Sequence, residues 1–67
     1  MKYLVQEYQQ SNGHLSMLSY EYSTIEDAQE KYYDILKYAV KSNTEKHGAI
    51  IYDEHLNEIA KEVFVHS

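Results

Sequence analysis

The stretch VQEYQQSNGHLSMLSYEYS, residues 5–23, decides the fold because it holds the clearest hairpin signal in the chain. Asn12-Gly13 is a preferred pair for a two-residue turn, since both turn positions need a positive φ angle. Runs rich in strand-forming residues flank this pair, as in the two strands of a hairpin. A turn at Asn12-Gly13 pairs Tyr8 with Met17, and this register determines which side chains share a face.

The register gives the first hairpin two faces that both contain large apolar side chains. One face carries Tyr3, Val5, Leu18, Tyr20 and Tyr22. The other face carries Leu4, Tyr8, Leu15 and Met17, mixed with polar residues. A second hairpin is expected from residues 49–53 and 58–66, around a turn in the segment DEHLNE. It is also apolar on both faces, with Ile50, Tyr52, Ile59 and Val63 opposite to Ala49, Ile51, Ala60 and Phe64.

One amphipathic helix is predicted between the two hairpins. Helical spacing places six apolar residues on one stripe, namely Ile25, Ala28, Tyr32, Ile35, Leu36 and Ala39. Two N-terminal caps fit the sequence: Ser23 with Glu26, as in a capping box, or Thr24 with Asp27. Residues 41–48 are interpreted as a polar linker after the helix.

The helix also contains three tyrosines, which are expected to differ in their surroundings. Tyr32 belongs to the apolar stripe and is assigned to the core, with its hydroxyl at the rim. Tyr33 is placed at the boundary of the core, and Tyr38 is placed in solvent.

Two hairpins and one helix predict a single α+β domain over residues 1–67, a ββαββ fold with a four-stranded antiparallel sheet and one helix packed on one face. The alternative is a pair of separate hairpins that sandwich the helix. In the first arrangement the helix covers one sheet face, and a monomer would expose the other apolar set. We therefore expect a homo-oligomer, foremost a homodimer, with an interface formed by Leu4, Tyr8, Leu15 and Met17.

The charge balance limits the partners of this small acidic protein. Eleven acidic residues stand against six lysines and no arginine, so the net charge is −5. Nucleic-acid binding rests on neutralised phosphates, and arginine is the usual reader of guanine, so no direct nucleic-acid binding is expected. No apolar stretch is long enough for a signal peptide or a membrane span, which favours a cytoplasmic protein that does not bind membranes.

No pattern of catalytic residues is found, and we expect a protein that is not an enzyme. The two glycines form no phosphate-binding loop, and no serine lies in a nucleophile elbow. The four histidines lack ligand spacing on one helix face and the chain has no cysteine, so no metal or other cofactor is expected. His47 is interpreted as an exposed linker residue. The acidic residues of the helix are interpreted as a solvated face: Glu26, Asp27, Glu30 and Asp34.

The segment EDAQEKYYDILKYAVKSNTEKHGAIIYDEHLNEIAKEVF, residues 26–64, follows a recognisable order of elements. A helix with Lys31-Tyr32 at its centre is followed by a polar linker, by His47 and by two strands. In this pattern the chain resembles small uncharacterised ββαββ orphan proteins of bacteriophages and prophages of Gram-positive bacteria. Those proteins often turn the second hairpin with Asn-Gly, where this chain has the segment 55–57, His-Leu-Asn.

The resemblance implies a non-catalytic phage or prophage accessory protein that acts by binding, as an inhibitor of a bacterial host defence system. The expected partners are a second copy of the chain and a host protein. The first alternative is a protein that sequesters a nucleotide signal, for which the candidate ligand-binding residues are Lys31, Tyr32, Tyr33 and His47. The second alternative is a small structural or regulatory protein of the virion or prophage.

Overall fold

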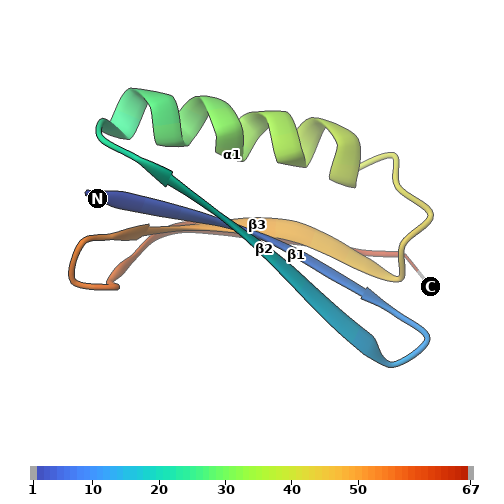
Figure 1. Ribbon diagram of the computed structural model, residues 1–67. Helices are drawn as coiled ribbons and strands as arrows, with labels where there is room; N and C mark the ends of the chain where they lie inside the picture. The colour runs from blue at the N-terminus through green and yellow to red at the C-terminus, as the bar shows by residue number, and fades with distance from the viewer. Residues whose placement is uncertain (1, 67) are drawn as a thin grey trace.

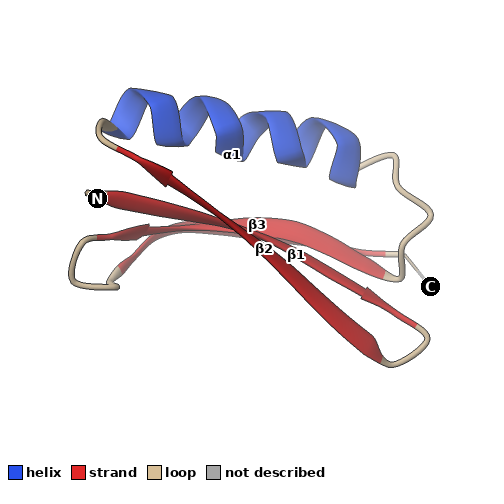
Figure 2. Ribbon diagram, in the orientation of Figure 1, coloured by secondary structure: helices blue, strands red, loops and turns tan. Residues whose placement is uncertain are grey.

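The computed structural model describes residues 2–66 as one four-stranded sheet with one helix packed on it (Figure 1). The strands are β1 (Tyr3–Ser11), β2 (His14–Tyr22), β3 (Lys46–Asp53) and β4 (Glu58–Val65), and the helix α1 (Ile25–Ala39) connects β2 to β3. The predicted ββαββ order and α+β class are confirmed. Helix and sheet form two layers, and α1 lies on one side of all four strands (Figure 2).

The first hairpin has the predicted register. Tyr8 lies opposite Met17, and the pairing runs without interruption from Tyr3 and Tyr22 to the turn. The φ angles of the turn residues Asn12 and Gly13 are 53° and 80°. Glycine and asparagine adopt this left-handed region at low cost, which explains why this dipeptide closes the hairpin.

The strand order in the sheet is β2-β1-β3-β4. β1 is antiparallel to both β2 and β3, so these two strands run in the same direction on either side of it. A connection between two strands of the same direction needs a crossover, and α1 provides it. The order puts the first and third strands of the sequence at the centre and leaves β2 and β4 at the edges.

The core lies between α1 and the two central strands. It consists of Val5, Ala28, Tyr32, Ile35, Ala49 and Ile51, with partly buried tyrosines around it. The two alanines, one from the helix and one from β3, leave no exposed surface. Small buried side chains on the helix and on the sheet let the two layers approach closely. The helix therefore covers the face that carries Val5 and Ile51.

Both ends of α1 are satisfied by identifiable partners. At the N-terminus, Thr24 Oγ1 accepts a hydrogen bond of 3.2 Å from the backbone N–H of Asp27. The N-cap is therefore Thr24, the second of the two predicted registers. At the C-terminus, Nε2 of His66 donates to the backbone carbonyl of Ala39 at 2.9 Å. This contact ties the last turn of the helix to the end of β4.

Three sequence predictions are wrong in detail. β3 begins at Lys46, not at Ala49, because it pairs with β1 over its whole length and reaches Gln10. His47, which the sequence placed in an exposed linker, is consequently a buried strand residue. Tyr33 was predicted at the boundary of the core, but its side chain is 63 % exposed.

The second hairpin turns around the carboxylate of Asp53. This carboxylate accepts hydrogen bonds from the backbone N–H groups of Asn57 and His55, each at 2.9 Å, and these bonds hold the pKa of Asp53 below its ordinary value. Leu56 takes the left-handed conformation in this turn, with a φ angle of 64°. A register shift between Ile51 and Tyr52 follows, so β3 and β4 pair with an irregularity near the turn. Among residues 2–66, no helix has the length and apolar character needed to cross a membrane.

We expect Ile35→Ala to lower the free energy of unfolding by about 2–5 kcal/mol, because it leaves a cavity under the helix. Tyr38→Ala, on the same helix, should cost less than about 1 kcal/mol, since this tyrosine is 64 % exposed. Urea unfolding followed by circular dichroism measures both values. Equal shifts of the two midpoints would contradict the observed rotation of α1.

We expect Thr24→Ala to destabilise the protein by about 1 kcal/mol, because the N-cap bond to Asp27 is lost. Ser23→Ala is the matched control and should leave the urea midpoint nearly unchanged. The reverse ranking would show that Ser23 caps the helix.

Candidate protein-binding surface

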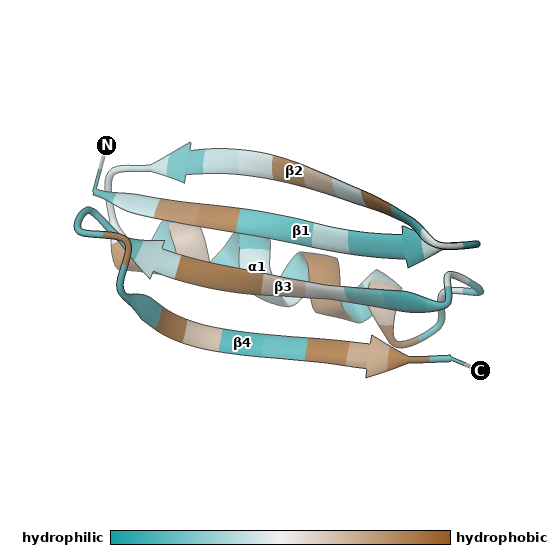
Figure 3. Cartoon of the chain, turned by 90° about the horizontal axis from the view of Figure 1, so that it is seen from below, coloured by the Kyte–Doolittle hydropathy of each residue, from teal (hydrophilic) through white to brown (hydrophobic). Residues whose placement is uncertain are grey.

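The sheet face opposite α1 is the largest surface with a consistent chemical character. We call it the uncovered face. The strand registers place eight apolar residues on it, namely Leu4, Tyr8, Leu15, Met17, Ile50, Tyr52, Val63 and Val65. Ile59 at the register shift is added by alternation along β4, two positions before Lys61. Figure 3 looks onto this face, with the four strands in front of the helix. The four residues predicted as an interface all lie on it.

The exposed part of the uncovered face lies towards its edges. Leu15 is 56 % exposed and Met17 42 % on β2, and Ile59 and Val65 are similarly exposed on β4. Ile50 at the centre is buried even without a helix above it, because the neighbouring strands shield it. Leu4 and Tyr8 are half-buried between these regions.

Polar side chains on the uncovered face bond to one another. The hydroxyl of Tyr8 donates to Oε1 of Gln10 at 3.2 Å, and Nε2 of Gln6 donates to Oγ of Ser19 at 3.3 Å. Such internal pairs lower the cost of removing the surface from water, since fewer polar groups lose a partner on contact. The face is thus suited to contact with another protein.

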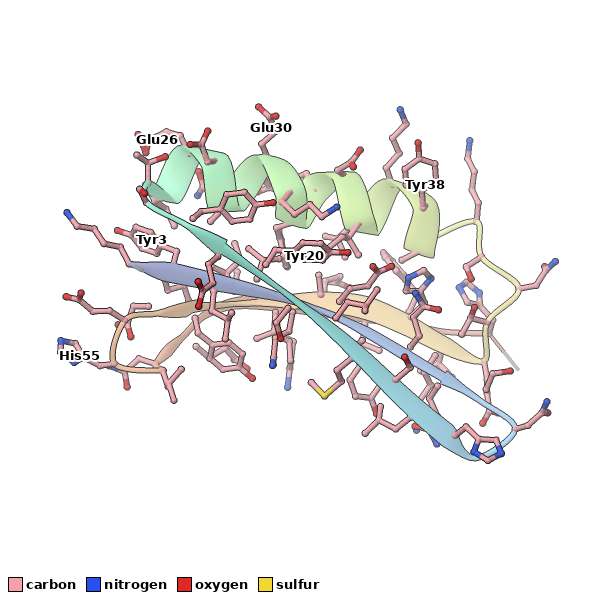
Figure 4. The ribbon with its side chains drawn as sticks, viewed as in Figure 1. Tyr3, Tyr20, Glu26, Glu30, Tyr38 and His55 are labelled. Atoms are coloured by element: carbon pink, nitrogen blue, oxygen red, sulfur yellow. The ribbon has the colours of Figure 1, made fainter. Side chains whose placement is uncertain are left out.

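Charges are distributed unequally between the two sides of the molecule. The strand residues on the uncovered face include two lysines, Lys46 and Lys61, and the acid Glu21, and a second acid, Glu58, is paired with Tyr52 of this face at the register shift. The helix on the opposite side carries four acidic residues: Glu26, Asp27, Glu30 and Asp34. In Figure 4 Glu30 points away from the sheet. The solvated acidic face predicted from the sequence is thus the outer side of the helix layer.

The four candidate ligand-binding residues have different surroundings. Nζ of Lys31 lies 4.3 Å from the centroid of the Tyr20 ring, on the β2 side of the helix. Tyr32 is in the core, and burial, together with the nearby carboxylates Glu62 and Glu58, raises its pKa above 10.0.

Tyr33 lies against Tyr32 with an edge-to-face geometry and a centroid distance of 5.3 Å, but its ring is largely exposed. His47 is buried in the sheet. Two of the four candidates, Tyr32 and His47, are thus buried, and only Lys31 and Tyr33 reach the surface.

A buried polar pair links the two central strands. Nε2 of His47 lies 2.7 Å from Oε2 of Glu7, and both side chains are mostly buried. Since a carboxylate only accepts, Nε2 donates in this bond. Gln9 adds a second donor to the same oxygen at 3.0 Å. Nδ1 of His47 has no hydrogen-bond partner among the described residues.

Sequence reasoning missed the Glu7–His47 pair because the two residues are forty positions apart. The partial signal was the strand alternation, which puts Glu7 on the same face as Val5. Pairing of β1 with β3 then brings His47 opposite Gln9. Within residues 2–66, no group of three metal-ligating side chains is found.

We expect Glu7→Ala and His47→Ala to destabilise the protein separately, because each leaves a buried polar partner unpaired. The double variant should lose less than the sum, with a coupling of about 0.5–3 kcal/mol. Urea unfolding of the four proteins in this cycle measures the coupling free energy. Additive losses would show that the pair does not contribute as a unit.

Comparison with protein-family models, with curated proteins and with solved structures gave no match.

Proposed function

We propose that this chain is a non-catalytic binding protein that works as a homodimer, with the uncovered face as the dimer interface. The observation that supports the proposal is the exposure of Leu15 and Met17 at one edge of the uncovered face and of Ile59 and Val65 at the other, with partly buried apolar side chains between them. Monomeric proteins seldom leave large contiguous apolar patches in water. A two-fold interface would place the same face of both copies in contact.

The charge distribution favours a second copy as the occupant of this face. Each chain carries a net charge of −5, so two copies repel each other at most orientations. Contact through the uncovered face gives four layers in the order helix, sheet, sheet, helix. The acidic helices are then on the two outer sides, at the largest separation that the shape permits. Lys46 and Lys61 lie near the contact instead.

The size of the domain gives the association a thermodynamic role. A chain of 67 residues buries a small core and is expected to be marginally stable alone. Burial of apolar surface contributes about 25 cal/mol per Å², part of which is lost to the entropy of association. A partner that binds only the folded chain stabilises it by mass action. Dimerisation therefore supports folding as well as function.

The resemblance to small phage and prophage proteins supplies the biological setting of the proposal. We place the protein among accessory proteins that bind and inhibit a component of a bacterial host defence system. Sequestration of a nucleotide signal is the less favoured function, because the burial of Tyr32 and His47 removes two of its four candidate ligand residues from the surface.

We expect the protein to sediment as a dimer at micromolar concentration and the double variant Leu15→Asp, Met17→Asp to sediment as a monomer. Each introduced carboxylate would be buried against apolar side chains of the other copy and close to the same carboxylate of that copy, which opposes association. The matched control is Tyr33→Asp with Tyr38→Asp, which adds the same charge at exposed apolar positions on the helix. A wild-type mass of 7.9 kDa would overturn the proposed dimer. A dimer that survives the β2 substitutions would move the interface elsewhere.

A further inference from the structure

β2 is an edge strand with little of the usual protection against pairing, since Glu21 is its one carboxylate. It has nine residues, its register with β1 is unbroken, and it contains neither proline nor lysine. Natural edge strands are commonly interrupted by bulges, proline or charged side chains. β4, at the other edge, has these features, with the irregularity near Tyr52 and with Glu58, Lys61 and Glu62 along it. The two edges of this sheet are therefore not equivalent.

The turn geometry identifies the backbone groups that β2 presents to a partner. In a two-residue hairpin the residues that flank the turn, here Ser11 and His14, exchange hydrogen bonds with each other. Alternate residues of β2 from His14 onwards therefore direct their N–H and C=O groups towards β1. The intervening residues direct these groups outwards: Leu15, Met17, Ser19 and Glu21.

The helix flank beside this edge is aromatic and carries more acidic than basic side chains. Asp27 and Asp34 lie three or four positions from Lys31, on the side of α1 where Lys31 contacts Tyr20. Figure 4 shows Tyr20 between the helix and β2. A surface hollow of about 540 Å³ is lined by Tyr22 of β2 and by six residues of α1, in which three acids outnumber two lysines: Asp27, Glu30, Lys31, Tyr33, Asp34 and Lys37.

We propose that the β2 edge binds an extended segment of a partner protein as a fifth strand, with basic side chains on the helix side and apolar side chains on the other. Backbone pairing would supply affinity, as in other cases of strand addition. The carboxylates of the helix flank would select lysine or arginine at alternate positions. The apolar positions would extend the uncovered face beside Leu15 and Met17. This inference goes beyond the proposed dimer and does not depend on it.

Charge argues against a second copy at this edge. Two β2 strands that pair antiparallel within one sheet place both helices on the same side of that sheet. The flanks with Asp27, Glu30 and Asp34 would then face each other across the seam. Like charges in that position cost free energy, whereas a basic foreign segment gains from the same carboxylates.

The test uses two end-blocked synthetic peptides of the length of β2, one alternating lysine with valine and the other alternating glutamate with valine. Fluorescence anisotropy at physiological ionic strength should show binding of the basic peptide that is at least about tenfold tighter than that of the acidic peptide. Amide hydrogen exchange should slow at Leu15, Met17 and Ser19, whose N–H groups point outwards, and not along β4.

Ser19→Pro removes one outward N–H and leaves the inward bonds to β1, so it should weaken binding at least about tenfold. Ser19→Ala keeps the N–H and should bind as the wild type. Asp34→Lys should weaken binding of the basic peptide and strengthen binding of the acidic peptide. The control Glu54→Lys makes the same charge change in the β3–β4 turn and should leave binding of both peptides unchanged. If Ser19→Pro does not fold, the comparison of Asp34→Lys with Glu54→Lys tests the proposal.

Several results would overturn the inference. They are equal binding of the two peptides, a basic peptide that binds Ser19→Pro as tightly as wild type, and exchange protection that appears on β4. Protection of Ser19 that depends on protein concentration without peptide, and that persists in the double variant Leu15→Asp, Met17→Asp, would show that a second copy occupies the edge. None of these results changes the dimer test at the uncovered face, which is read from the mass.

Discussion

One helix has to cover a sheet of four strands, and the rest of this structure depends on that mismatch in width. A helix with its side chains is about 10 Å across, and neighbouring strands lie about 4.8 Å apart. α1 therefore spans roughly two strands, and it packs mainly on β3 and β1. The two central strands supply the sheet side of the core, whereas β2 and β4 lie largely outside the footprint of the helix.

The limited footprint explains residues whose exposure does not follow from strand alternation. Leu18 is on the same sheet face as Val5 but remains 49 % exposed, because β2 extends beyond the helix and twists away from it (Figure 1). Glu7 lies opposite Leu18 at this margin. There the covered face changes from apolar to polar, and the bond between Glu7 and His47 satisfies two polar groups that neither solvent nor the helix reaches fully.

The limited width of the helix also leaves the protein with three surface regions of different chemical character. The outer side of α1 is acidic, the uncovered face is apolar with paired polar groups, and the β2 edge offers free backbone hydrogen-bonding groups. A larger protein would cover the second face with further helices. A short chain that retains these surfaces is suited to association, and the proposed functions each use one of them: the uncovered face for a second copy and the β2 edge for a target segment.

The sequence by itself determined the local structure. Asn12-Gly13 specified the first hairpin and its register, helical spacing identified the stripe with Ile35, and strand alternation grouped Leu4 with Tyr8, because each signal depends on neighbours in the chain. The tertiary structure decided which of two apolar faces the helix covers, and it chose the one with Ala49. The strand order, the early start of β3, the burial of His47 and the weakly protected edge at β2 also depend on the pairing of β1 with β3. That pairing joins residues far apart in the chain, so packing of the whole domain decides it and no local pattern reports it.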